Sequence, residues 1–343
     1  KTLSSILCSF CPTICRQVSL SQNVGDLAVI SVRIADRKCE AHNIYSFELV
    51  SATGEALPPF SAGSHIDVHL PNGLIRQYSL YNSSHAEHSY KIAVLLAPEG
   101  RGGSAAMHQL KVGQELNISQ PRNLFPLSHE AKKTLLFAGG IGITPILSMA
   151  ERLSQIGAEF ELHYYSRSWE HAAFAEKLKS CSFAHRINLC FDSEPETKPD
   201  LASLLANRNP DEHLFVCGPT GFMNFVLDSA RNAGWGEDQL HREYFANEAS
   251  DTDSNQSFEI TIASTQQVLN VPADRSILQV LMENEVDIPY SCEQGVCGTC
   301  LVRVLEGTPD HRDLYLSASE RSANDQMLTC CSRAHGKKLV LDI

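Results

Sequence analysis

The sequence predicts a multidomain protein with an antiparallel β-barrel, a doubly wound α/β domain and a small α+β domain, in that order. Three observations predict it. Short alternating strands separated by turns fill the first third of the chain, βα units alternate in the middle, and a polar stretch then precedes a segment with its own alternating strands. With 343 residues, of which 43% are hydrophobic, the chain is long enough for two or three separate cores.

The barrel is expected at residues 26–128. Its strands are expected where apolar and polar residues alternate, at Ala28–Ile34, Ser46–Val50, His65–Leu70 and Tyr90–Leu96. Turns are expected at Pro71-Asn72-Gly73 and Pro98-Glu99-Gly100. Short antiparallel strands with such turns are typical of a small barrel.

Residues 1–25 are interpreted as an N-terminal appendage. They contain Cys8, Cys11 and Cys15, which could also be a metal clip or part of the remains of a targeting segment. Neither alternative is strong, because a fourth metal ligand is missing and Ser, Pro and Arg16 interrupt the apolar residues.

The second domain, expected at residues 129–245, alternates strands and helices. An apolar strand, Thr134–Ala138, leads through a glycine turn into a helix with apolar residues at Ile146, Leu147, Ala150 and Leu153. The pattern continues with Phe160–Tyr165, the helix-like Ala172–Leu178, Ile187–Phe191, the segment Leu201–Leu205, and Leu214–Cys217 before another helix. Alternating β and α elements predict a parallel, doubly wound sheet.

Two turns of this domain suit a dinucleotide. The turn from Gly139 to Pro145 reads GGIGITP, where glycines let a pyrophosphate approach the backbone, Thr144 can cap the helix and Pro145 suits its first turn. Pro145 stands where the G-x-G-x-x-G fingerprint has its third glycine, and such turns also occur for packing reasons. Cys217-Gly218-Pro219 strengthens the hypothesis because it ends a later strand at the same sheet edge.

A polar, acidic stretch at residues 246–257 is expected to be a linker, and the last domain spans 258–343. Phe258, Ile260 and Ile262 alternate with polar residues, Ile277–Met282 has a helix-like apolar face, Leu301–Leu305 is strand-like, and Leu339, Leu341 and Ile343 alternate again. This order predicts a compact α+β fold.

Four cysteines of the last domain have the spacing of a plant-type [2Fe-2S] site. Cys292, Cys297 and Cys300 follow the pattern C-x4-C-x2-C, and 29 residues separate Cys300 from Cys330. Gly295 and Gly298 allow backbone to pass close to sulfide. A structural zinc site is the alternative, but zinc prefers paired C-x2-C clusters and no second pair is present at the fourth-ligand end. The domain is therefore expected to be a plant-type ferredoxin (β-grasp) domain.

The identity of the fourth ligand is the less certain part of this hypothesis, since Cys330 and Cys331 are adjacent. The spacing favours Cys330, with Cys331 as a small buried neighbour.

Two segments of the barrel region could hold a flavin. Arg76-Gln77-Tyr78-Ser79-Leu80 combines a cation, an aromatic ring and a hydroxyl on one expected strand, with Ser79 suited to the flavin N5 and Arg76 to phosphate. The loop Gly100-Arg101-Gly102-Gly103-Ser104 adds a glycine-rich nest suited to the flavin phosphate. The pentapeptide alone is weak evidence for a flavin site, because Arg and Tyr on a strand are usually surface residues.

In this order, RQYSL, GRGGS, GGIGITP, CGP and CEQGVCGTC resemble the phthalate dioxygenase reductase family, and are close in pattern to vanillate O-demethylase reductase components. The resemblance runs from about Asp26 to Ile343. It implies an FMN-binding barrel, an NADH-binding domain and a ferredoxin domain. It also implies contacts to FMN from Arg76, Tyr78, Ser79, Gly103, Ser104, Thr144 and Phe245, with Glu243 a weaker candidate. Implied nucleotide contacts are Gly140, Gly142, Thr144, Ser166, Arg167, Cys217, Gly218 and Pro219, and further cofactor contacts are Leu80, Ala93, Gly102 and Pro145.

Two choices of cofactor depend on the resemblance. It favours NADH, and Asp192 offers a ribose acceptor, whereas Arg167 could pair with the 2′-phosphate of NADPH. FMN rather than FAD depends on the GRGGS loop alone.

The three modules together predict an electron-transfer enzyme. NADH gives up two electrons as a hydride and a [2Fe-2S] cluster takes one, so a flavin must stand between them. Ser79 is expected to tune the flavin N5 and Cys217 to lie near the nicotinamide. The resemblance implies that the acceptor is a Rieske-type non-haem iron oxygenase or demethylase acting on an aromatic compound. Alternatives are a reductase for a cytochrome P450 or another monooxygenase, and a non-enzymatic redox sensor.

Composition excludes some partners and bounds the compartment. A formal charge of −12 argues against nucleic acid, and no apolar run reaches the length of a membrane helix. Residues 251–343 contain 14 acidic and 7 basic residues, which form either a solvated face or a surface that attracts a basic partner. Scattered cysteines outside the cluster motif favour a reducing cytoplasm. We therefore expect a soluble cytoplasmic protein.

Overall fold

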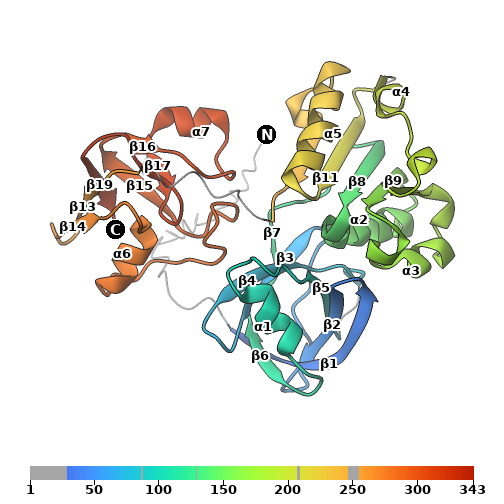
Figure 1. Cartoon of the computed structure of the whole chain (residues 1–343), viewed down its shortest axis with the longest axis horizontal. Helices are drawn as coiled ribbons and strands as arrows, with labels where there is room; N and C mark the ends of the chain where they lie inside the picture. The colour runs from blue at the N-terminus through green and yellow to red at the C-terminus, as the bar shows by residue number, and fades with distance from the viewer. Residues whose placement is uncertain (1–28, 86–87, 129, 207–208, 246–254) are drawn as a thin grey trace, which may run out of the picture.

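The structure is a computed structural model that describes residues 29–85, 88–128, 130–206, 209–245 and 255–343. These residues form three lobes, each with its own sheet and core, that meet near the middle of the molecule (Figure 1). The expected appendage at residues 1–25, with Cys8, Cys11 and Cys15, lies outside the described residues. So does most of the expected linker at 246–257.

The first lobe is an antiparallel barrel, as the alternating strands predict. Its elements are β1 (Ile30–Ala41), β2 (Ile44–Ser51), β3 (Ser64–His69), β4 (Ile75–Ser79), β5 (Tyr90–Leu95), α1 (Gly103–Gln109), β6 (Glu115–Ile118) and β7 (Arg122–Asn123). The strands pair in the order β4-β3-β6-β1-β2-β5, and β7 pairs with β3. The segment that follows β4 pairs with β5 through a hydrogen bond of 2.9 Å, which the Tyr81 amide donates to the Lys91 carbonyl. Ile34, Phe47 and Ile66 are fully buried inside.

The second lobe has a parallel sheet of order β10-β9-β8-β11-β12, which confirms the doubly wound fold. Its strands are β8 (Lys133–Gly139), β9 (Glu159–Ser166), β10 (Ile187–Phe191), β11 (Glu212–Cys217) and β12 (Leu240–Glu243). Its α-helices are α2 (Ile143–Gln155), α3 (Ala175–Ser180), α4 (Leu201–Ala206) and α5 (Thr220–Asn232). Short 3₁₀ turns lie at Gly140–Gly142, Trp169–His171, Ala184–Arg186, Pro195–Thr197 and Glu237–Gln239. Strand order reverses at β8, so a crevice forms where β8 and β11 end.

One local prediction in this lobe is wrong. Gly142, not Thr144, is the N-cap of α2, and no side chain caps this helix end. The Thr144 hydroxyl instead donates to the Ile141 carbonyl at 3.1 Å. The 3₁₀ turn Gly140–Gly142 leads directly into α2 at Ile143, so Thr144 already lies inside the helix. Pro145 lies in the first turn, as expected.

The third lobe is a mixed five-stranded sheet of order β14-β13-β19-β15-β17, which confirms the ferredoxin-type α+β fold. Its elements are β13 (Phe258–Ile262), β14 (Val268–Val271), α6 (Ile277–Glu283), β15 (Leu301–Glu306), β16 (Pro309–Asp310), α7 (Ala318–Ala323), β17 (Gln326–Leu328), β18 (Arg333–Ala334) and β19 (Lys338–Asp342). Ser276 begins α6 with a capping box, in which its hydroxyl accepts from the Gln279 amide at 3.1 Å. Four apolar side chains of α6 are then buried against the sheet.

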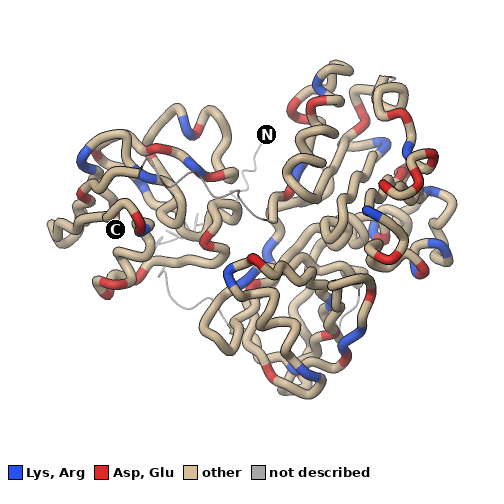
Figure 2. The backbone as a smooth tube through the Cα atoms, viewed as in Figure 1, with Lys and Arg blue, Asp and Glu red and all other residues tan. Residues whose placement is uncertain are grey.

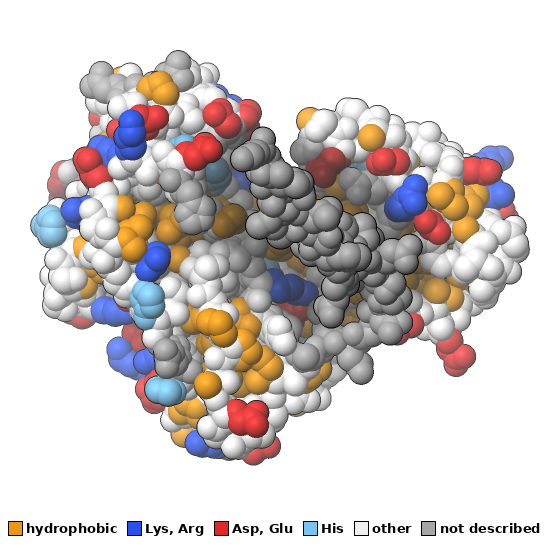
Figure 3. All heavy atoms as spheres, turned by 180° about the vertical axis from the view of Figure 1, so that it is seen from behind, with side chains coloured by type: hydrophobic (Ala, Val, Ile, Leu, Met, Phe, Trp, Pro, Cys, Tyr) orange, Lys and Arg blue, Asp and Glu red, His pale blue; other side chains and the backbone are white. Residues whose placement is uncertain are grey.

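Charged side chains are interspersed over the three lobes (Figure 2). From behind, basic side chains also lie among the acidic ones of the third lobe (Figure 3). Ion pairs such as Arg312–Asp310 at 2.7 Å and Arg275–Glu283 at 3.2 Å engage several of its acids. This pattern favours the solvated-face explanation of the acidic excess. Within the described ranges, no helix combines the length and apolar character needed to cross a bilayer.

Candidate functional site

The structure brings the four predicted cluster ligands together. Cys292, Cys297 and Cys300 lie in the loop between α6 and β15, which we call the cluster loop (residues 291–300), and Cys330 follows β17. The Cys292 thiol interacts with those of Cys297 and Cys330, and the Cys300 thiol interacts with that of Cys330. These contacts lower the pKa of Cys292 and raise the pKa of Cys297 and Cys330, so the thiols lie within hydrogen-bonding reach of one another.

The backbone of the cluster loop also fits a [2Fe-2S] group. Amide groups are aimed at sulfur, from Gln294 to Cys292 at 3.3 Å and from Gly295 to Cys330 at 3.2 Å. Gly298 has a φ of +75°, and a Cβ there would lie 2.4 Å from the Tyr315 ring. Iron–sulfur sites use such N–H donors to stabilise charge on sulfur.

A cavity of about 1120 Å³ lies where the three lobes meet, and we call it the junction cavity. Its wall combines β3 and β4 of the barrel, the connector 124–128, the end of β12, the cluster loop and residues 314–321. Of the residues expected to bind cofactor or metal, Arg76, Ser79, Phe245 and Cys292 line it. Its volume slightly exceeds the roughly 300–1000 Å³ of typical ligand sites, so it has room for a flavin.

Ser79 and Glu243 meet in the wall of this cavity. Ser79 ends β4 and is 5% exposed, and its hydroxyl donates to Glu243 Oε2 at 3.2 Å. Burial raises the pKa of Glu243 to about 8, so this carboxyl holds a proton at neutral pH. Glu243, the weaker sequence candidate, therefore places a protonated acid beside the hydroxyl expected near the flavin.

Arg76 packs on the glycine-rich loop at residues 100–104, but no residue of that loop lines the cavity. The Arg76 stem packs so closely on Gly103 that a Cβ there would lie 2.7 Å from its Cγ. Its guanidinium donates to the Ile75 carbonyl at 2.7 Å. Among the other predicted contacts, Tyr78, Leu80, Ala93, Gly102, Gly103 and Ser104 do not appear in the cavity wall.

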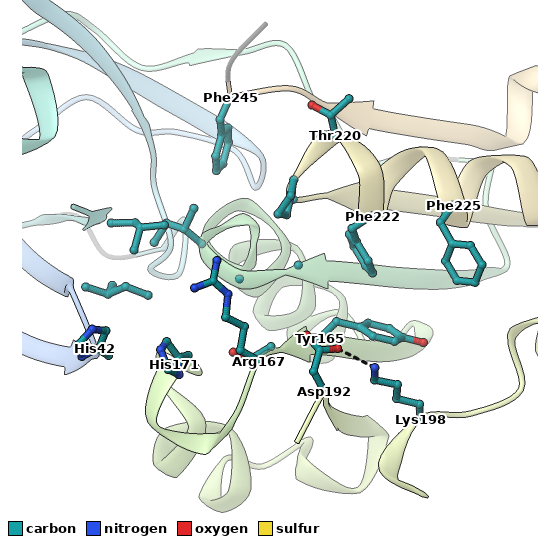
Figure 4. A pocket seen from close by; sticks show the side chains of 18 of the residues that line it. His42, Tyr165, Arg167, His171, Asp192, Lys198, Thr220, Phe222, Phe225 and Phe245 are labelled. Atoms are coloured by element: carbon teal, nitrogen blue, oxygen red, sulfur yellow. Dashed lines mark hydrogen bonds and ion pairs between the residues drawn. The ribbon is translucent and has the colours of Figure 1, made fainter. Parts of the chain in front are cut away.

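A second cavity, of about 1200 Å³, occupies the crevice at the carboxyl edge of the parallel sheet, and we call it the nucleotide crevice (Figure 4). Five residues expected to bind the nucleotide line it, namely Gly140, Ser166, Arg167, Gly218 and Pro219. Gly142, Thr144, Pro145 and Cys217 lie behind its wall. Gly142 packs on the Cys217 carbonyl, and a Cβ added at Gly142 would lie 2.2 Å from that oxygen.

Cys217 is fully buried. Burial, together with the neighbouring Glu243, raises the pKa of its thiol well above the usual range. The thiol is therefore protonated, and only the backbone that follows it reaches the nucleotide crevice.

The outer end of the nucleotide crevice is aromatic and charged. Tyr165 and Phe222 lie 5.1 Å apart between ring centroids, with Phe225 beside them on α5 (Figure 4). Asp192 pairs with Lys198 at 2.6 Å, so the expected ribose acceptor already has a cationic partner.

The sequence analysis missed the barrel's part of the nucleotide crevice. His42, from the β1–β2 turn, faces His171 with ring centroids 5.1 Å apart. No motif marks either histidine, because the contact depends on how the two lobes dock.

Phe245 lines both cavities and is 39% exposed. It directly follows β12 and Tyr244, at the last described position before residue 255. The two cavities therefore meet at one aromatic side chain.

Comparisons with known proteins cover nearly the whole described chain. A family model of the 2Fe-2S iron-sulfur cluster binding domain matches residues 260–335. Vanillate O-demethylase oxidoreductase from Pseudomonas sp. (strain HR199) is 52% identical over 317 residues, which are 92% of this chain and 100% of that protein. Carnitine monooxygenase reductase subunit from Escherichia coli (strain K12) is 39% identical over 325 residues, 93% of this chain and 100% of that protein.

Two solved structures extend the likeness to the fold. Phthalate dioxygenase reductase, described as modular for electron transfer from pyridine nucleotides to [2Fe-2S], has 37% identity and a TM-score of 0.75 over 92% of this chain and 98% of that chain. An intact type IV self-sufficient cytochrome P450 monooxygenase has 36% identity and a TM-score of 0.79 over 92% of this chain and 41% of that chain.

Proposed function

The chain belongs to the reductase family of vanillate O-demethylase oxidoreductase and phthalate dioxygenase reductase, and we propose that it passes electrons from NADH through FMN and a [2Fe-2S] cluster to a separate terminal oxygenase. The observation that carries the proposal is the continuity of the two cavities with the cluster loop. Phe245 lines both cavities, and Cys292 lines the junction cavity. Donor, carrier and acceptor sites thus form one path.

The residues of the nucleotide crevice bind and orient the dinucleotide. Gly140 leaves the crevice open beside the start of α2, since no other atom lies within 4 Å of where its Cβ would be. Arg167 and Lys198 line the crevice as cations and Phe222 as an aromatic surface. Asp192 pairs with Lys198, which makes it a weaker acceptor for the ribose hydroxyl than the sequence suggests. The preference for NADH over NADPH is therefore a part of this proposal.

In the junction cavity, Ser79 presents its hydroxyl and Glu243 holds a proton next to it. Arg76 supplies positive charge for the flavin phosphate side. When bound here, FMN would supply the exchange between two-electron and one-electron transfer that a one-electron cluster requires. The modules at 26–128, 129–245 and 258–343 are proposed to hold FMN, NADH and the cluster respectively.

The proposed acceptor is a Rieske-type non-haem iron oxygenase or demethylase acting on an aromatic compound. Support comes from the relatives named for vanillate O-demethylase and phenoxybenzoate dioxygenase. A second candidate is a cytochrome P450, because a self-sufficient P450 contains a segment that resembles 92% of this chain.

Anaerobic titration with NADH tests the proposal, with absorbance and EPR recorded together and the released flavin identified by mass. We expect FMN to bleach and the reduced [2Fe-2S] EPR signal to appear after NADH is added. Absence of a bound flavin, or a cluster that stays oxidised with excess NADH, would refute it. A parallel NADPH titration tests nucleotide choice, and NADH-driven turnover with each purified oxygenase class tests the acceptor.

A further inference from the structure

One face of the barrel's β3–β4 pair is polar and turned toward the other two lobes. His65 lies opposite Ser79 and Asp67 opposite Gln77, so the four side chains share one face while Ile66 and Val68 face the core. Ser79 meets Glu243 of the second lobe. Asp67, on the same face, meets the third lobe.

Asp67 is 4% exposed and accepts hydrogen bonds from three side chains. Arg122 donates to its Oδ2 at 2.6 Å, and Gln77 and Ser291 donate to its Oδ1 at 3.1 and 2.8 Å. Burial and the nearby Arg122 lower the pKa of His65 to about 4, so that imidazole is neutral and Arg122 supplies the charge that balances Asp67. Of the three donors, Ser291 is the one from another lobe.

Ser291 directly precedes the ligand Cys292 and is 1% exposed. Its bond to Asp67 therefore fixes the start of the cluster loop against the barrel. A hydrogen bond to a charged, buried acceptor is stronger than an ordinary one and is directional.

A second set of contacts holds the next residues of the loop. Arg101 donates to the carbonyls of Cys292 and Glu293 at 3.1 and 3.2 Å. With its amide turned to satisfy both groups, Gln294 accepts from Arg101 at 2.8 Å and donates to the Phe245 carbonyl at 3.2 Å. The loop is thus held from two sides.

We propose that Asp67 and Ser291 are positioning residues that dock the cluster loop beside the junction cavity and so set the rate of electron transfer from the flavin to the cluster. The inference rests on the proposed function. Its physical reason is that the rate of electron transfer between two centres falls steeply as the distance between them grows, so a cluster loop that moves away from the junction cavity slows this step. Asp67 and Ser291 belong to none of the sequence motifs, and neither is a cluster ligand.

Ser291→Ala tests the inference in the cofactor-loaded full chain. NADH–ferricyanide reduction reports electron delivery to the flavin, and NADH–cytochrome c reduction requires the cluster as well. We expect the ferricyanide rate to stay within about two-fold and the cytochrome c rate to fall by about ten-fold. Losing a hydrogen bond to a charged group should lower the docked population of the cluster loop by about this factor. The dithionite-reduced EPR spectrum should be unchanged. Hydrogen–deuterium exchange of the peptide around residues 289–296 should rise.

Thr261→Val is the matched control, since it removes a buried hydroxyl without a partner from the same lobe. It should leave both rates and the exchange unchanged. Asp67→Asn in the Ser291→Ala background should add little to the fall in the cytochrome c rate, because Asp67 contacts the cluster loop through Ser291, whereas its bonds to Arg122 and Gln77 stay within the barrel.

An unchanged ratio of the two rates in Ser291→Ala, an altered EPR spectrum, or an equal loss in Thr261→Val would each overturn the inference. If wild type itself reduces ferricyanide at no measurable rate with NADH, the proposed function fails instead.

Discussion

The cluster loop and the junction cavity are built in opposite ways. Cys292, Cys297 and Cys300 come from nine consecutive residues, whereas the cavity draws its wall from all three lobes. The metal site is thus largely a property of one local segment, and the cavity a property of how domains dock. Changes to the ligands or glycines of the loop should remove or destabilise one cofactor, and changes in the cavity should alter the rate of a step while both cofactors remain.

The largest expected effect comes from removing a ligand. Cys300→Ser should abolish the [2Fe-2S] EPR signal and lower NADH–cytochrome c reduction by at least about 100-fold, since all four thiolates are needed. NADH–ferricyanide reduction should persist, because no Cys300 atom lines the junction cavity. Loss of both activities together would show that the two sites are not independent.

The next effect tests the loop backbone. Gly298→Ala places a Cβ 2.4 Å from the Tyr315 ring at a φ of +75°, so we expect cluster loss on mild heating and a free energy of unfolding lower by roughly 1–3 kcal/mol. Gly221→Ala, where nothing lies within 4 Å and the residue is helical, is the control and should be neutral or stabilising. Thermal melts of the two variants, followed at the cluster absorbance, measure this difference.

A cavity substitution should act on rate alone. Ser79→Ala removes the hydroxyl that donates to Glu243, and we expect flavin reduction by NADH to slow by about ten-fold with the cluster spectrum intact. Stopped-flow absorbance measures this step. Unchanged hydride-transfer kinetics would reject the role of Ser79.

The last effect is a dependence of stability, not of rate, on pH. The pKa of Glu243 is near 8 in the folded protein and 4.5 in an ordinary peptide, so the folded state holds this proton more tightly. Wild type should lose stability relative to Glu243→Gln as pH rises from about 4.5 to about 8, by roughly 4 kcal/mol. Denaturant melts at pH 5, 6.5 and 8 measure the difference, and parallel curves would contradict the shifted pKa.

Patterns within short segments were predictable from the sequence. The strands Ile187–Phe191 and Phe258–Ile262 were expected at their observed bounds, because alternation and flanking turns mark them locally. The predicted ligand thiols are marked locally too, by their spacing, and the structure places them close together. In the Gly100–Ser104 stretch, by contrast, a loop was expected but α1 begins at Gly103, since packing under Arg76 and not local propensity starts that helix.

Contacts between lobes could not be predicted. His42 enters the nucleotide crevice from a barrel turn, and Ser291 reaches Asp67 across 224 positions of the chain. Cys217, expected at the nicotinamide, is buried behind Gly142 because the close approach of two backbone segments leaves its side chain no path outward.

Gln294 belongs to the spacer between two ligands, yet it touches both Arg101 and the Phe245 carbonyl. A chimera that exchanged only the last domain for that of another reductase would keep its cysteines but lose this match to the two host domains. Interchangeability of these modules therefore depends on a spacer residue that the cysteine pattern leaves unspecified.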